Sequence, residues 1–412
     1  MTGLAPTLGE VPLSDTGRVP HIDIVRGVAV FGLIWSNLNA GGYTGPPSDA
    51  HAIAQWAAAV FSAGKFWTLF SLLFGVSLAI QLDRARATSR AIAGRWLRRM
   101  LVLYGIGWAH ALLLWPGDIL RGYALAGAVL ILFRRASNRT ILAAAVVAFA
   151  LAANRESLSV VATRLVRGNV EAVQQRERPD AQQQGRRKNF ERATQSGSYV
   201  ELVGARLATF PREVVRQASP PAGPLNLIDP GVFALFLLGL VLGRRQVLQH
   251  PDRHQRIVNA FIAVGGFVGL GLSVYLASRP AWLLGHWLSG PLGVIAQVSL
   301  MLGYLGSLLW LLQRPSWQAR LRWLGPVGRL GLTNYVAQTA FLTYVQFGYG
   351  LGLDPVLDSF ECVALALAFY LLQVICSNWW VRHFDVGPVE WFWRRLTHWS
   401  VHSAPIAAVA AG

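Results

Sequence analysis

The chain has little charge for its length. Asp, Glu, Lys and Arg together make up 14% of its 412 residues, whereas 53% are apolar. Ordinary soluble domains carry roughly 25% charged residues, so this chain lacks the polar surface that would keep a protein of its size in solution. The high apolar content also excludes an intrinsically disordered chain. The composition therefore predicts an integral membrane protein.

Cysteine and lysine are nearly absent. The two cysteines, Cys362 and Cys376, fall in one apolar stretch, where the rise of a single helix keeps them too far apart for a disulfide. A fold held by a disulfide framework is excluded for the same reason. The basic residues are almost all arginine, with Lys65 and Lys188 as the exceptions.

The net charge of +17 is the feature that would suggest nucleic acid as a partner. The arginines, however, mostly lie in short stretches between apolar segments. The positive-inside rule of membrane proteins produces this distribution. We therefore expect the lipid bilayer, and not nucleic acid, as the partner of the chain.

The apolar residues are gathered into ten segments of about the length of a membrane-spanning helix. The fourth and fifth segments are shorter and rich in Ala or Gly, so counts of nine or eleven also fit. The pattern predicts an all-α polytopic bundle. The segments cover residues 20–40, 64–82, 96–115, 119–133, 139–154, 228–248, 257–278, 289–312, 328–347 and 359–381.

The loop arginines predict the orientation of the bundle. One set of alternate loops, together with the residues after the last segment, carries twenty arginines, and the opposite short loops carry only Arg279. The arginine-rich side is expected to face the cytoplasm, which places both termini there. The chain then divides into helices 1–5 (residues 1–154), an extracytoplasmic insert (155–227), helices 6–10 (228–381) and a cytoplasmic tail (382–412).

The insert at residues 155–227 departs from the charge pattern, since it holds twelve basic and seven acidic side chains. A segment of this length is exempt from the positive-inside rule. Its apolar residues fit one or two amphipathic helices that lie on the membrane or cap a cavity, and a partly ordered linker fits equally well. The apolar positions are Val160, Leu165, Val170, Val173, Tyr199, Leu202, Val203 and Leu207.

No motif of a soluble enzyme is present. The sequence contains no Walker loop, no His-Glu-x-x-His, no Gly-x-Ser-x-Gly and no Cys-x-x-Cys, and no metal is expected. The candidates are instead polar side chains at membrane depth, which are costly in lipid and therefore functional by default. At the expected outer ends of the first four helices they are Asn37, Asn39, Lys65, His110, Asp118 and Arg121.

This outer group contains the parts of an acid–base site. A neutral His110 could act as general base toward a hydroxyl or amine, with Asp118 orienting the imidazole and stabilising the imidazolium. Lys65, Arg121 or the Asn37 amide could stabilise an oxyanion. Structural alternatives stay open. Asp118 and Arg121 suit an i,i+3 ion pair. Lys65 could simply extend its side chain to the membrane interface. His110 could be a core histidine whose hydrogen bonds are satisfied within the protein.

A second polar group lies near the expected inner face. Asp23 and Arg26 lie one turn apart in the first segment, and the ninth segment holds the i,i+4 pair Asn334 and Gln338. These residues suit either a substrate-binding vestibule or contacts that lock helix packing. The arginines from Arg84 to Arg99 are placed to hold the phosphates of a nucleotide-like donor, although topogenic charge explains them equally well.

Five stretches carry a recognisable combination of residues. They are Asp23-Ile-Val-Arg-Gly27 with Trp35-Ser-Asn37; Gly64-Lys-Phe-Trp-Thr-Leu-Phe-Ser-Leu-Leu-Phe-Gly75; His110-Ala-Leu-Leu-Leu-Trp-Pro-Gly-Asp-Ile-Leu120 with Tyr123; Gly328-Arg-Leu-Gly-Leu-Thr-Asn-Tyr335; and Phe384-x-x-Gly-Pro-x-Glu-Trp391. Together they resemble the YeiB-like family of bacterial integral membrane proteins, domain of unknown function 418. The resemblance covers close to the full length and implies a multi-pass protein of the bacterial cell membrane.

The Asp-x-x-Arg-Gly start of the first segment, with an Asn near its outer end, is also similar to the transmembrane acyltransferase superfamily, which includes heparan-alpha-glucosaminide N-acetyltransferase. Those enzymes take a cytoplasmic acyl-CoA and acylate an acceptor on the far side, with an Asn and a His in the site. Asn37 matches the Asn position. The outer loop offers His51 for the His, in a context that differs, whereas His110 belongs to the motif of the nearer family.

This resemblance implies an acyltransferase that moves an acyl group, expected to be acetyl, from acyl-CoA to an extracytoplasmic hydroxyl or amine. A sugar, a glycolipid or a secreted metabolite would be a fitting acceptor. The alternative is a transporter or exporter of a small polar or anionic solute, with the buried charges as its permeation site, although no internal inverted repeat is visible. A non-catalytic membrane scaffold and assembly into a homo-oligomer also stay open.

Overall fold

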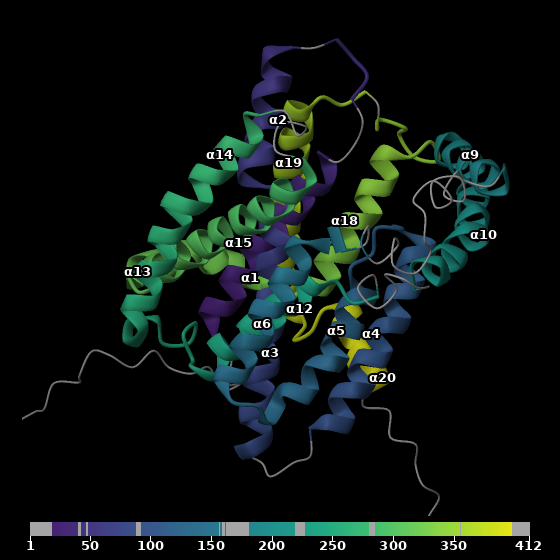
Figure 1. Ribbon diagram of the computed structural model, residues 1–412. Helices are drawn as coiled ribbons and strands as arrows, with labels where there is room; N and C mark the ends of the chain where they lie inside the picture. Colours follow the sequence, from purple (N-terminus) through teal and green to yellow (C-terminus); the bar gives the residue numbers. More distant parts are fainter. Residues whose placement is uncertain are drawn as a thin grey trace, which may run out of the picture.

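The computed structural model describes residues 19–39, 43–46, 48–87, 92–155, 157–158, 161, 181–218, 227–279, 285–354 and 356–397. Over these residues the protein is all helical, and none of them lies in a β-strand. Figure 1 shows α1 and α12 in the middle of the bundle, with α13, α14 and α15 on one side and α9 and α10 on the opposite side. The predicted all-α bundle is confirmed.

The first five apolar segments each coincide with a helix, and an additional helix, α2, lies between the first and second segments. The fourth segment ends in a short 3-10 turn, η1. The helices are α1 (Pro20–Leu38), α2 (Asp49–Phe61), α3 (Lys65–Ala87), α4 (Ala93–Leu113), α5 (Leu120–Leu130), η1 (Ile131–Arg135) and α6 (Asn138–Ala153).

The last five apolar segments coincide with α12, the run from η2 to α14, α15, α18 and α19. Within the second of these, η3 is a π-helix. The elements are α12 (Pro230–Arg244), η2 (Pro251–His254), α13 (Gln255–Ala263), η3 (Val264–Leu270), α14 (Gly271–Ala277), α15 (Gly285–Leu312), α16 (Pro315–Leu321), η5 (Arg322–Leu324), α17 (Gly325–Arg329), α18 (Gly331–Gln346), α19 (Ser359–His383) and α20 (Pro388–Thr397).

The length and composition of these helices are those of a multi-pass membrane protein. Among the described residues, 4 helices are long and apolar enough to cross a membrane: Asp49–Ala85, Pro251–Ala277, Leu288–Leu312 and Ser359–His383. Asn138–Ala153 and Pro230–Arg244 are shorter apolar helices. The count of ten spans and the orientation of the termini stay predictions.

The centre of the bundle depends on close approach between α3 and α12, the most extensive helix pair. A Cβ on Gly75 would lie 2.0 Å from the carbonyl oxygen of Phe236, and a Cβ on Gly239 would lie 2.0 Å from that of Leu72. Glycine therefore allows the two backbones to touch, as small residues commonly do between membrane helices. This contact fixes α3, one wall of the cavity described below.

The insert contributes α9 (Ala181–Gln195) and α10 (Tyr199–Ala218). Figure 1 shows this pair beside the C-terminal ends of α4 and α18. The end of α9 is tied to the loop after α18, because the amide of Gly348 donates to the carbonyl oxygen of Thr194 at 2.8 Å. Of the apolar positions that suggested amphipathic helices, Leu202 is fully buried. Val160, Leu165, Val170 and Val173 lie outside the described residues.

Candidate functional site

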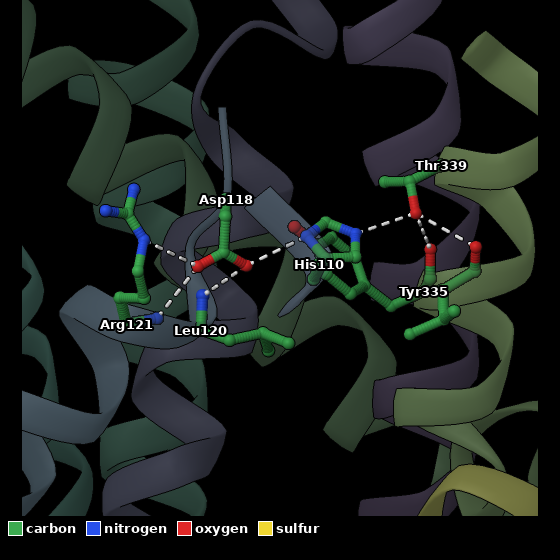
Figure 2. A network of polar contacts seen from close by, with 7 residues as sticks. His110, Asp118, Leu120, Arg121, Tyr335 and Thr339 are labelled. Atoms are coloured by element: carbon green, nitrogen blue, oxygen red, sulfur yellow. Dashed lines mark hydrogen bonds and ion pairs between the residues drawn. The ribbon is translucent and has the colours of Figure 1, made fainter. Parts of the chain in front are cut away.

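His110 lies in the last turn of α4 and contacts a polar group on each side of its ring (Figure 2). Its Nδ1 is 3.0 Å from Oδ1 of Asp118, and the two side chains are 2% and 0% exposed. Its Nε2 is 2.8 Å from the hydroxyl oxygen of Thr339 on α18. The ring of Tyr335, one turn earlier on α18, packs on the imidazole with 5.0 Å between ring centres.

Asp118 is held rigidly by the start of α5. Its carboxylate accepts the backbone N–H of Leu120 at 3.1 Å and that of Arg121 at 3.0 Å, and Nε of Arg121 lies 3.3 Å away. Asp118 therefore caps the exposed N–H groups of the helix and also forms the i,i+3 ion pair with Arg121. The carboxylate can cap the helix, pair with Arg121 and contact His110 at the same time, because the oxygen that faces His110 is not the one that pairs with Arg121.

The carboxylate determines which nitrogen of His110 carries the proton. Nδ1 has no aligned hydrogen-bond acceptor, so its 3.0 Å contact with Asp118 is an ion-pair contact with imperfect geometry. An anionic oxygen at that distance still favours a proton on Nδ1. In the neutral ring Nε2 is then an acceptor, and the Thr339 hydroxyl, whose one proton also has the backbone oxygens of Val336 and Tyr335 within reach, can donate to it. This is the tautomer that a general base requires.

Arg121 lies between two aromatic rings. Its guanidinium carbon is 5.1 Å from the ring centre of Trp108 on α4 and 4.4 Å from that of Phe210 on α10. Cation–π contacts of this kind contribute roughly 0.5–2 kcal/mol each. They hold Arg121 beside Asp118 and connect the insert to the site.

A second arginine of α10 fixes the insert to the end of α4. Arg206 is 1% exposed, and its Nη1 donates to the carbonyl oxygen of Leu113 at 2.9 Å, as does the hydroxyl of Tyr199 at 2.8 Å. This satisfies a terminal carbonyl of α4. Burial lowers the pKa of the Arg206 guanidinium, and Tyr349 and Tyr199 oppose that shift. The insert therefore covers the C-terminal end of the helix that carries His110.

Gly107 provides the space in which α5 begins so close to α4. A Cβ on this residue would lie 2.7 Å from Cγ of Arg121 and 2.9 Å from Oδ2 of Asp118. Any larger residue would therefore push the first turn of α5 away from α4. Gly107 lies one turn before His110 on the same face of α4. The space beside Gly107 therefore accommodates the Asp118 carboxylate next to the His110 ring that it contacts.

A cavity of about 250 Å³ lies on the other side of Tyr335. Leu120 and Tyr335 line the end nearest His110. Its apolar and aromatic lining includes Phe70, Leu73, Phe74, Trp96, Leu103 and Tyr123. Its charged lining consists of four arginines and two carboxylates: Arg26, Arg99, Arg329, Arg394, Asp23 and Glu390. The cavity therefore joins an arginine-rich end to the residues packed on His110.

Two of these arginines are held by specific contacts. Arg26 donates to Asp23 at 2.9 Å and to the hydroxyl of Ser77 on α3 at 3.3 Å. The guanidinium carbon of Arg99 lies 4.0 Å from the ring centre of Trp393, and the indole N–H of Trp393 donates to the backbone oxygen of Arg99 at 2.9 Å. The amphipathic α20 is thereby placed along one side of the cavity.

Glu390 lies in the Phe384–Trp391 motif, and its contacts show what this motif does in the fold. Its Oε1 accepts the backbone N–H of Leu332 at 2.8 Å and of Thr333 at 3.0 Å, and its Oε2 accepts the hydroxyl of Thr333. A carboxylate at these N–H groups stabilises the start of α18. The helix that carries Tyr335 and Thr339 is therefore anchored by the tail.

Three other candidates lie apart from the His110 network, and two of them have polar partners elsewhere. Lys65 donates to the carbonyl oxygen of Ala59 at 2.6 Å and so caps the end of α2. His51 accepts the backbone N–H of Ser359 at 3.1 Å and so caps α19. Asn37 is half-buried near the outer end of α1. The structure thus joins His110, Asp118 and Arg121 and leaves these three apart.

The Asn334 and Gln338 pair lies in a buried polar network between α18, α19 and α1. Asn334 donates to the hydroxyl of Ser377 at 3.0 Å, and Gln338 donates to Oε1 of Gln373 and to the backbone oxygen of Val30, both at 2.9 Å. Neither residue lines the cavity. These contacts lock helices together, as interhelical hydrogen bonds do in membrane bundles.

Sequence reasoning assigned no role to Thr339, Gly107, Trp393 or Phe210. Thr339 follows a quoted motif by one helical turn, which is the signal that could have found it. Gly107 precedes His110 at i−3, the spacing of two residues on one helix face. The contacts of Trp393 and Phe210 come from segments far away in sequence, and no local pattern indicates them.

A buried histidine–carboxylate pair inside an apolar helix bundle defines a polytopic membrane protein with a polar site within the bundle. Among the described residues no cluster of three His, Cys, Asp or Glu side chains is placed to hold a metal. The family model "Protein of unknown function (DUF418)" matches residues 242–400.

Two bacterial relatives align over nearly the whole chain. YxaH of Bacillus subtilis (strain 168) is 28% identical over 97% of this chain and 98% of its own length. YeiB of Escherichia coli (strain K12) is 28% identical over 91% of this chain and 95% of its own length. No solved structure matches the chain. The family model and these relatives support the resemblance to the YeiB-like DUF418 proteins that the motifs predicted.

Proposed function

We propose that the protein is a membrane-embedded acyltransferase. It moves an acyl group, expected to be acetyl, from a cytoplasmic acyl-CoA to a hydroxyl or amine of an extracytoplasmic acceptor. The observation that carries this proposal is the cavity, because it connects an arginine-rich end with Tyr335 and Leu120, the residues packed around the His110–Asp118 pair.

The cavity suits the shape and charge of such a donor. The whole cavity, at about 250 Å³, is large enough for a linear thioester arm but too small for a whole nucleotide as well. The nucleotide phosphates would then lie at Arg26, Arg99 and Arg394, which offer fork-shaped donors for phosphate oxygens. The positive-inside rule puts this end on the cytoplasmic side, where acyl-CoA is found.

The polar network supplies acid–base chemistry at the other end. His110, with Nδ1 3.0 Å from Asp118, can take a proton at Nε2, and the carboxylate stabilises the imidazolium that forms. The site is buried from water, which strengthens that stabilisation. Proton removal of this kind contributes roughly 10²–10⁴-fold to a rate.

The first experiment measures donor binding without any acceptor. The full-length protein in lipid nanodiscs is titrated with acetyl-CoA, and the rise in its unfolding temperature is recorded. Trp393→Leu removes the ring that holds Arg99 and is expected to weaken acetyl-CoA binding by roughly 3- to 30-fold. Trp391→Leu is the matched control, since Trp391 on the same helix is 59% exposed.

The second experiment measures turnover. Proteoliposomes containing the protein receive acetyl-CoA, with glucosamine, glucose or glycerol as acceptor, and the release of the CoA thiol is followed. His110→Gln is expected to lower thiol release at least about 100-fold, while His383→Gln, at the exposed end of α19, retains the wild-type rate. Solute flux without acetyl-CoA binding or thiol release would overturn the proposal in favour of a transporter.

A further inference from the structure

The Nε2 atom of His110 faces a side chain of its own protein. The hydroxyl oxygen of Thr339 lies 2.8 Å away, the shortest of its three polar contacts. The hydroxyl therefore occupies the position in which a bound acceptor would present its own hydroxyl to the base. Carboxylate, imidazole and hydroxyl follow one another from Asp118 through His110 to Thr339 (Figure 2).

A carboxylate, an imidazole and a hydroxyl in this order form the arrangement that activates a hydroxyl nucleophile. Thr339 has two other contacts, with the backbone oxygens of Val336 at 2.9 Å and Tyr335 at 3.2 Å. A carbonyl oxygen only accepts, so these contacts orient the hydroxyl before its proton moves to Nε2 and are lost when it does. The three side chains come from α4, the start of α5 and α18, so the order is a product of the tertiary structure.

We propose that Thr339 is the nucleophile of the transfer and carries the acyl group as an ester between donor and acceptor. This inference rests on the proposed acyltransferase function. Thr339 lies one turn beyond Tyr335, which lines the cavity. Thr339 itself is fully buried and does not line the cavity, so the transfer requires the Tyr335 ring to move aside and admit the thioester.

The two half-reactions balance without a further reactant. In the first, the Thr339 oxygen forms a bond to the thioester carbon and the carbon–sulfur bond breaks. His110 takes the hydroxyl proton and passes it to the departing CoA sulfur. In the second, the acceptor oxygen or nitrogen attacks the ester carbon and the bond to Thr339 breaks. His110 takes the acceptor proton and returns it to the Thr339 oxygen.

A covalent carrier suits reactants that arrive from opposite sides of a membrane. Donor and acceptor would otherwise have to meet at one atom of a network in which Asp118 is 0% exposed and His110 is 2% exposed. With Thr339 as carrier each partner approaches in turn, and only the acyl group crosses the middle of the bundle. The expected kinetics are those of a double displacement, with CoA released before the acceptor binds.

The test detects the ester directly. The full-length protein in nanodiscs is mixed with radiolabelled acetyl-CoA and no acceptor, unfolded in acid, and digested for peptide mapping. A wild-type chain is expected to carry the acetyl group on Thr339. Adding glucosamine before the acid step is expected to remove the label and to produce the acetylated acceptor.

Variants at two threonines separate chemistry from folding. Thr339→Val keeps the shape of the side chain without its hydroxyl and is expected to lower bound label at least about 100-fold, whereas Thr339→Ser keeps a nucleophile and stays within about 10-fold. Thr343→Val is the matched control, because Thr343 lies one turn further on α18 and is equally buried. Its label is expected to equal that of the wild type.

The outcomes distinguish this inference from the function on which it rests. Thiol release and acetylated acceptor without label on the chain, or label on His110, would overturn the role of Thr339 and leave the acyltransferase intact. Wild-type turnover by Thr339→Val would do the same. If the wild type neither binds acetyl-CoA nor releases thiol, the proposed function itself fails.

Discussion

Asp118 shows how a single side chain serves both folding and chemistry. One carboxylate oxygen accepts the Arg121 N–H and the other accepts the Leu120 N–H while facing His110. Asparagine caps a helix nearly as well as aspartate, but it lacks the charge that stabilises an imidazolium. The two roles can therefore be separated by one substitution.

Asp118→Asn keeps the cap but loses the ion pair with Arg121, so it is expected to lower the unfolding temperature and to lower thiol release from acetyl-CoA at least about 100-fold. Asp229→Asn is the control. Asp229 caps α12 through the N–H groups of Gly231 and Val232 and has no contact with the network. Both variants are compared by thermal unfolding in nanodiscs and by the thiol assay. Wild-type turnover in Asp118→Asn would exclude the carboxylate from the reaction.

At the scale of helices, glycine residues position the site because they allow neighbouring helices to approach closely. Gly107 permits the contact between α4 and the start of α5, just as Gly75 and Gly239 permit the contact between α3 and α12. In each case a backbone or side chain of the neighbouring helix occupies the space of a Cβ. The position of a helix end in this bundle therefore depends on residues that carry no chemistry themselves.

Gly107→Ala is expected to destabilise the fold by about 1–3 kcal/mol, because its methyl group overlaps Arg121 and Asp118. Gly105→Ala is the matched control on the same helix. A Cβ there has nothing within 4 Å, so the substitution is expected to be neutral or to stabilise by up to about 1 kcal/mol. Unfolding in nanodiscs measures both. Equal stability of the two variants would contradict the close α4–α5 contact.

At the scale of the whole molecule, the distribution of arginine predicts which side of the membrane each loop faces. Lys188 on α9 and Arg253 on η2 are both exposed, and the alternation of spans puts them on opposite sides. Their accessibility from outside the cell tests the orientation of the entire bundle. The two sites are far from the His110 network in sequence, so the test is independent of function.

Single cysteines report this orientation. In a chain with Cys362→Ala and Cys376→Ser, Lys188→Cys is expected to react with a membrane-impermeant thiol reagent on intact cells. Arg253→Cys is expected to react only after the membrane is opened. Labelling of Arg253→Cys on intact cells, with Lys188→Cys protected, would reverse the orientation and with it the cytoplasmic access assigned to the cavity.

The sequence predicted the helices well, because each apolar segment reads as a helix from local composition alone. It also identified His110, Asp118 and Arg121, since charged side chains are costly inside an apolar segment and therefore stand out. It could not separate these residues from Lys65, Asn37 and His51. The depth of a residue along its helix does not show in which direction its side chain points or which helix lies next to it.

By itself, then, the sequence determined a helical membrane protein that resembles the YeiB-like family and a short set of polar candidates. Only the tertiary structure decided that His110 lies between Asp118 and Thr339 and that Lys65 and His51 cap helix ends. It alone joined Arg99 and Trp393 in one wall of the cavity. The physical reason is that hydropathy is a local property of each helix, whereas a site depends on contacts between helices distant in the chain.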